Sequence, residues 1–98
     1  MEQLEMLNFT KDELQKLADN KQLIDVRSKE EYDEAHIPGA LLYPLDEIET
    51  FDLPKDREYY AYCRSGKRSE MASQYLEQLG YEFKNLNGGI IAYVNEVK

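Results

Sequence analysis

The sequence predicts an α/β domain built around a mainly parallel central sheet. Segments with the pattern of strands alternate with segments with the pattern of helices in five repeats, which is typical of parallel β-α units. The chain has 98 residues, 42% of them hydrophobic, which suits one small globular core. No low-complexity tract or Gly/Ser linker divides it, so we expect a single domain over residues 1–98.

Local patterns place the individual elements. The expected strands are residues 4–7, 22–26, 40–43, 58–62 and 83–86. The expected helices are residues 11–20, 29–35 and 69–79, with a last one through residues 91–94 and a helical turn at 46–51. Thr10 with Glu13 and Ser28 with Glu31 form capping boxes that mark the first two helix starts, and Gly80 ends the third helix.

The charge balance and the cysteine count exclude several classes of function. Twenty acidic and 12 basic side chains give a net charge of −8, so we expect no nucleic-acid partner and no binding to an anionic membrane. Cys63 is the only cysteine, which rules out an intramolecular disulfide and a two-cysteine redox cycle. The N-terminal segment lacks a signal-peptide pattern and no apolar run is long enough to span a membrane. A reducing, cytoplasmic location is expected.

The segment CRSGKRS at residues 63–69 carries the strongest functional signal. Cys63 follows a predicted strand, and in parallel sheets active sites lie at the carboxyl ends of strands. Arg64, Lys67 and Arg68 place three cations in five positions of an acidic protein, and Gly66 lets the backbone curl. A loop that turns into a helix directs several free amides at one point. We therefore expect an anion site around a Cys63 thiolate, stabilised by the helix start and by the cations.

Simpler interpretations exist for the same residues. A lone cysteine in the interior is often a small hydrophobic side chain with no reactivity. Each of the three cations could be solvated charge that offsets acidic neighbours such as Glu58 and Glu70. The position of glycine and cations beside Cys63 at a strand-to-helix junction favours the reactive interpretation.

Three blocks of the sequence resemble the rhodanese family of sulfurtransferases. They are CRSGKRS at 63–69, IDVRSKEEYDEAHIPGA at 24–40 and LNGGIIAY at 86–93, and together they span nearly the whole chain. Ala35 stands where the family usually has glycine, and Tyr93 where it usually has tryptophan. The resemblance implies a five-stranded sheet with helices on both faces.

The resemblance also implies a sulfur relay. Cys63 would take the sulfane sulfur of thiosulfate or of a persulfide donor, hold it as a persulfide, and pass it to a thiol, a protein cysteine or cyanide. No metal and no organic cofactor is expected. The residues expected to bind the substrate are Arg64, Ser65, Gly66, Lys67, Arg68 and Ser69.

Other residues of the matching blocks have structural interpretations. Asp25 follows a strand and should bind turn amides, while Arg27 and Glu31 lie four residues apart and could pair. His36, the only histidine, lies in a turn, and a thiolate ionised by its loop needs no general base. Gly88 and Gly89 are expected to form a tight turn before the last helix.

Three other functions compete with sulfur transfer. Protein tyrosine phosphatases and rhodanese-fold phosphatases also place a cysteine before an anion-binding loop, and an arsenate-type reductase would use a similar arrangement. The phosphatase pattern needs arginine six positions after cysteine, whereas Arg68 lies five positions after Cys63. A non-catalytic rhodanese-like interaction module is the third alternative, although such modules commonly lack the cysteine.

Overall fold

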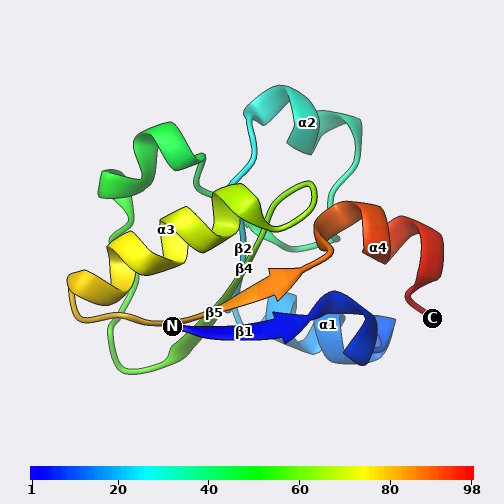
Figure 1. Ribbon diagram of the computed structural model, residues 1–98, viewed down its shortest axis with the longest axis horizontal. Helices are drawn as coiled ribbons and strands as arrows, with labels where there is room; N and C mark the ends of the chain where they lie inside the picture. The colour runs from blue at the N-terminus through cyan, green and yellow to red at the C-terminus, as the bar shows by residue number, and fades with distance from the viewer.

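Five parallel strands form one sheet in the computed structural model, which describes residues 1–98 (Figure 1). The strands are β1 (Glu2–Glu5), β2 (Leu23–Asp25), β3 (Leu41–Leu42), β4 (Glu58–Tyr62) and β5 (Glu82–Asn87). Their order is β1-β5-β4-β2-β3, and every neighbouring pair is parallel. The carboxyl ends of all strands therefore lie at one edge, with β4 in the middle.

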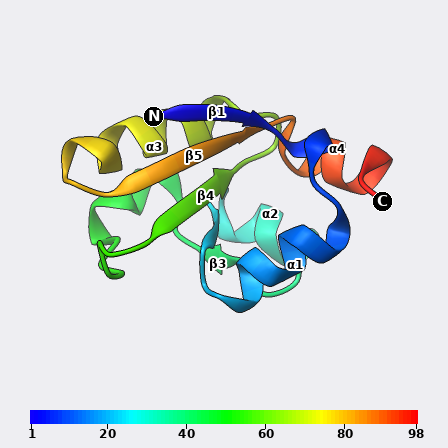
Figure 2. The same ribbon diagram turned by 90° about the horizontal axis from the view of Figure 1, so that it is seen from below.

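Helices cover both faces of this sheet, as expected. They are α1 (Lys11–Asp19), α2 (Lys29–Glu34), α3 (Lys67–Gln78) and α4 (Gly89–Glu96), with two 3₁₀ helices, η1 (Met6–Asn8) and η2 (Leu45–Thr50). Helices α1 and α4 pack on one face, and α3 with η2 packs on the other (Figures 1 and 2). Both capping boxes are formed, because Thr10 and Ser28 each accept the amide of the glutamate three residues on.

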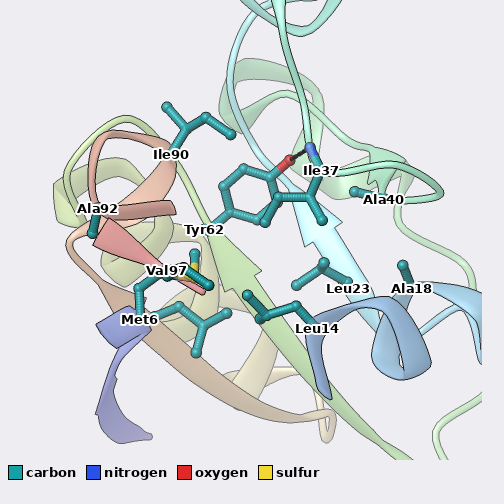
Figure 3. Close-up of a cluster of buried hydrophobic side chains, with 11 residues drawn as sticks. Met6, Leu14, Ala18, Leu23, Ile37, Ala40, Tyr62, Ile90, Ala92 and Val97 are labelled. Carbon is teal, nitrogen blue, oxygen red and sulfur yellow. Dashed lines mark hydrogen bonds between the residues drawn. The ribbon is translucent and has the colours of Figure 1, made fainter. Parts of the chain in front are cut away.

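Each face of the sheet has its own hydrophobic cluster. Under α1 and α4 the cluster is mainly aliphatic and surrounds Tyr62, whose hydroxyl accepts the Ile37 amide at 3.1 Å (Figure 3). Under α3 the cluster is rich in aromatic rings, with Phe51 in edge contact with Tyr59 and Phe83 at centroid distances of 5.2 and 5.4 Å. The two clusters hold β4 between them and so fix the position of its carboxyl end.

Most expected boundaries lie within one or two residues of those in the structure, and two of the differences have a clear physical reason. The first strand is Glu2–Glu5 rather than residues 4–7, since its side chains are largely exposed on an edge strand and leave little hydrophobic pattern to detect. Helix α3 begins at Lys67 rather than near Ser69, because Gly66 is its N-cap with φ of 135°. Two residues of the predicted loop, Lys67 and Arg68, are therefore in the first turn of α3. None of the helices combines the length and the apolar character that a membrane span requires.

Candidate active site

Cys63 lies directly after β4, at the carboxyl edge of the sheet. Its side chain is buried, with 1% of the residue exposed. The sulfur accepts a hydrogen bond from the Gly66 amide at 3.1 Å and contacts the Ser69 hydroxyl, a donor, at 3.4 Å. Strand β4, the loop and the first turn of α3 thus meet at the thiol, as the sequence predicts.

The carbonyl groups of the loop are fastened to the turn between β5 and α4. The carbonyls of Cys63, Arg64 and Ser65 accept hydrogen bonds from the amides of Ile90, Ile91 and Gly88, at 2.9, 3.3 and 2.8 Å, respectively. In a trans peptide the N–H points away from the C=O of the same plane. The amides of residues 64–66 therefore point away from α4, and that of Gly66 reaches the sulfur.

Glycine at position 89 is what allows this close approach. A Cβ atom there would lie 2.3 Å from the Cys63 carbonyl oxygen and 2.5 Å from that of Arg64. Gly89 also has a positive φ, 54°, as does Gly88 with 95°. The two glycines form a tight turn, as expected, and this turn supports the back of the Cys63 loop.

The surroundings of Cys63 favour its thiolate. Burial raises the pKa of the thiol, but hydrogen bonds from the Ser69 hydroxyl and from the amides of Ser69, Gly66 and Ser65 outweigh it, so the pKa lies below its ordinary value. We expected the nearby cations to contribute as well. None of them donates to the sulfur, and Arg68 acts on it only through its charge, so the main stabilisation comes from the hydroxyl and the backbone.

The three cations of the loop do not share one site. Arg68 forms a two-pronged ion pair with Glu31 of α2, with N···O distances of 2.7 and 2.9 Å. The Lys67 side chain is 83% exposed and lies 3.8 Å from Glu70. Arg64 forms no ion pair and lines a groove of about 260 Å³ beside α4. Arg64 is thus the one cation of the loop without an ion pair.

The predicted pairing of Arg27 with Glu31 is wrong. Arg27 is buried and pairs with Asp25, with Nη2 to Oδ2 at 2.8 Å, and it also donates to the Ala35 carbonyl. Asp25 accepts the Arg27 amide at 2.9 Å, so its expected contact with the turn is confirmed. Because Asp25 and Arg27 are both held at the end of β2, they satisfy each other, and Glu31 is left for Arg68.

His36 forms no hydrogen bond to the thiol. Its ring stacks on Tyr32 with a centroid distance of 3.7 Å, and Nδ1 donates to the Tyr32 carbonyl at 2.7 Å. These contacts give His36 a structural place at the end of α2. No group of three or more His, Cys, Asp or Glu side chains is arranged to hold a metal ion.

One residue at the site, Asn85, is not among those predicted from the sequence. Asn85 of β5 is fully buried and donates to the Gly66 carbonyl at 3.1 Å. The signal for it was present, since strand alternation puts Asn85 on the same sheet face as Phe83, where a polar residue needs a partner.

Comparison with known proteins identifies the family. Residues 10–96 match the sequence profile of the rhodanese-like domain. The chain belongs to the rhodanese-like family. It is 45% identical over 84 residues to a sulfurtransferase of Allochromatium vinosum, covering 81% of this chain and 78% of that protein. It is 42% identical to the putative sulfurtransferase YtwF of Bacillus subtilis, covering 78% and 76% of the two chains.

Solved structures agree with this assignment. A rhodanese-like domain protein from Staphylococcus aureus superposes with a TM-score of 0.78 at 33% identity, covering 100% of this chain and 99% of that chain. The human single-domain sulfurtransferase TSTD1 gives a TM-score of 0.76 at 28% identity over 92% and 96% of the two chains. The chain spans only 34% of the putative sulfur carrier YrkF of Bacillus subtilis, to which it is also similar. The named relatives support a sulfurtransferase-type function for the rhodanese-like domain.

Proposed function

We propose that this protein transfers sulfane sulfur through a persulfide on Cys63. The donor is a small anion, thiosulfate or a persulfide, and the acceptor is a thiol, a protein cysteine or, in the laboratory, cyanide. The observation that carries the proposal is the set of donors at Cys63 Sγ, namely the Gly66 amide at 3.1 Å and the Ser69 hydroxyl at 3.4 Å. A merely structural cysteine needs no such donors.

The first half of the reaction loads the cysteine. The Cys63 thiolate attacks the outer sulfur of thiosulfate and forms a new S–S bond. The S–S bond of thiosulfate breaks, and sulfite leaves with the electron pair. The product is an anionic persulfide, Cys63–S–S⁻. Amides that point toward the sulfur stabilise this anion as they stabilise the thiolate, and their position is set before the reaction begins.

The second half unloads it. A thiolate or cyanide attacks the outer sulfur of the persulfide, the S–S bond to Cys63 breaks, and Cys63 leaves as a thiolate. The low pKa of the Cys63 thiol makes it a good leaving group. Charge is balanced at each step without a metal or an organic cofactor. A reducing compartment keeps Cys63 free, and we place the reaction in the cytoplasm on that ground.

The loop favours sulfur over phosphate chemistry. Arg68, the arginine that ends the CRSGKR segment, has both of its terminal nitrogens committed to Glu31. A tetrahedral phosphate would have to compete with that carboxylate for the guanidinium. A single sulfur atom on Cys63 needs only the amides, and Arg64 is free to attract an anionic donor.

The test is the mass of the intact protein after incubation with thiosulfate. We expect a gain equal to one sulfur atom, which cyanide or dithiothreitol removes with formation of thiocyanate or sulfide. Cys63→Ser should show no gain and no turnover. A Cys63→Ser variant that still converts thiosulfate at the wild-type rate would refute the proposal. Wild-type protein that folds but gains no sulfur from thiosulfate or from a persulfide would favour a non-catalytic module.

A further inference from the structure

Asn85 is a buried polar side chain that contacts the start of α3 and that the proposed reaction does not use directly. In the sheet it is paired in register with Gln3 of β1 and Ala61 of β4. Its side chain is 0% exposed and shares the sheet face of Phe83, under α3. Burying an amide in such a place costs free energy unless it forms hydrogen bonds. The hydrogen bonds of Asn85 therefore indicate its role in the structure.

The amino group of Asn85 makes all of these contacts. Its two N–H donors lie within hydrogen-bond distance of three acceptors, so two of these share a hydrogen: the Gly66 carbonyl at 3.1 Å, Gln3 Oε1 at 2.8 Å and Asn87 Oδ1 at 3.0 Å. Its own carbonyl oxygen, Oδ1, is buried with no hydrogen-bond partner. An unpaired buried carbonyl is unfavourable, so the hydrogen bonds donated by Nδ2 must offset the cost of the unpaired Oδ1.

The direction of this amide is determined from both sides. Gln3 Nε2 donates to the Glu70 carboxylate at 2.6 Å, and an ionised carboxylate only accepts, so Gln3 must turn its oxygen toward Asn85. On the other side the Gly66 carbonyl can only accept as well. The amino group of Asn85 is thus the one group that satisfies both neighbours.

Gly66 needs a hydrogen bond to its carbonyl because a glycine backbone has little intrinsic preference for one conformation. With φ of 135° and ψ of −16° it occupies a region that other residues rarely adopt, and it can leave that region at little cost. The peptide before Gly66 is held by the bond from the Gly88 amide to the Ser65 carbonyl. The peptide between Gly66 and Lys67 is held through the Gly66 carbonyl. Of the donors to that carbonyl, Asn85 is the one that belongs to the sheet.

We propose that Asn85 is a positioning residue that locks the peptide between Gly66 and Lys67 to the sheet and so keeps the loop amides aimed at Cys63. The other two donors to the Gly66 carbonyl, the Ser69 hydroxyl and the Glu70 amide, belong to α3 and move with it. Asn85 alone ties this point to β5. The inference rests on the proposed function for its biological meaning, but the geometry of the thiol can be tested without any sulfur transfer.

The experiment compares the pH dependence of iodoacetamide alkylation at Cys63 in the wild type and in Asn85→Leu. Leucine has a similar volume and keeps the core filled, but it cannot donate to Gly66. We expect the alkylation midpoint to rise by roughly half to one pH unit, the size of one hydrogen bond that favours the thiolate. Arg68, the cation whose charge acts on Cys63, is unchanged in this variant.

Phe83→Leu is the matched control, because Phe83 is buried on the same strand and face but its side chain forms no hydrogen bond to the loop. It should lower the melting temperature without moving the alkylation midpoint. If Asn85→Leu does not fold, Asn85→Ser provides the same test, since serine is too short to reach Gly66 and keeps the site polar. A midpoint equal to that of the wild type in a folded Asn85 variant, or an equal shift in Phe83→Leu, overturns the inference.

The two proposals fail in different ways. Wild-type protein that gains sulfur, with an unchanged midpoint in the Asn85 variant, keeps the sulfurtransferase and removes the positioning role. Wild-type protein that gains no sulfur, with a raised midpoint in the variant, keeps the positioning role and removes the reaction.

Discussion

Replacing Glu31 by glutamine removes the charge that joins α2 to the start of α3. Glu31 receives two hydrogen bonds from Arg68, at 2.7 and 2.9 Å, and these, with smaller contributions from Ser28, lower the pKa of its carboxyl from 4.5 to about 2. Glutamine keeps the side-chain oxygen that accepts the Ser28 amide, so the capping box of α2 survives. The substitution therefore tests the ion pair rather than the helix.

The magnitude follows from the pKa. Each pKa unit corresponds to about 1.4 kcal/mol, so a fall from 4.5 to about 2 sets an upper bound of about 3.5 kcal/mol. The side chains of Arg68 and Glu31 are 36% and 29% exposed, and solvent screening reduces the value. We expect Glu31→Gln to lower the free energy of unfolding at pH 7 by about 1–2 kcal/mol. For a chain of this size that is a fall in melting temperature of at least about 4 °C.

The dependence on pH is the sharper part of the prediction. The pKa of Glu31 is lower in the folded state, so the pair stabilises the protein fully above about pH 4.5 and loses this effect as the pH falls toward 2. Thermal unfolding followed by circular dichroism at pH 7, 4.5 and 2.5 should show the two proteins converging at low pH. The control is Asp33→Asn, which breaks the exposed pair with Lys29 and should leave the melting temperature unchanged. A difference between Glu31→Gln and wild type that stays constant down to pH 2.5 would refute an electrostatic origin.

Three further predictions concern the Cys63 loop. In the wild type, the pH midpoint of iodoacetamide alkylation should lie below that of a free cysteine. Ser69→Ala removes the largest stabilising contact of the thiolate, so this midpoint should rise by roughly half to one pH unit. An unchanged midpoint contradicts this prediction. Hydrolysis of para-nitrophenyl phosphate should be negligible beside thiocyanate formation and should appear, if at all, only after one residue is inserted between Cys63 and Arg68; robust phosphate turnover lost in Cys63→Ser would promote the phosphatase. Gly89→Ala should reduce both stability and sulfur loading, because the added Cβ would lie 2.3 Å from the Cys63 carbonyl oxygen. In the control Gly80→Ala the added Cβ would lie 3.8 Å from the nearest atom, so this variant should affect stability alone. Equal sulfur loading in the two alanine variants would argue against a role for the turn at Gly88 and Gly89.

The sequence by itself determined the features that depend on neighbours in the chain. Capping boxes at Thr10 and Ser28 join residues three apart, and both are formed in the structure. Alternating and helical patterns of hydrophobic residues placed the remaining elements to within a few residues, and the strand that delivers Cys63 was predicted with the bounds it has, residues 58–62. Such signals are readable because their energies arise within a single turn or strand.

Only the tertiary structure decided which distant groups meet. Glu31 could reach Arg27 four residues earlier, but folding gives it Arg68, 37 residues away, because Arg27 is already satisfied by Asp25. The loop cations were predicted as one anion site, yet their side chains extend in different directions and the amides surround the sulfur instead. The bond from Asn85 to Gly66 spans 19 residues and joins strand to loop. A pair of this kind forms only when the sheet and the helices above it have brought its members together, and their spacing in the chain carries no trace of it.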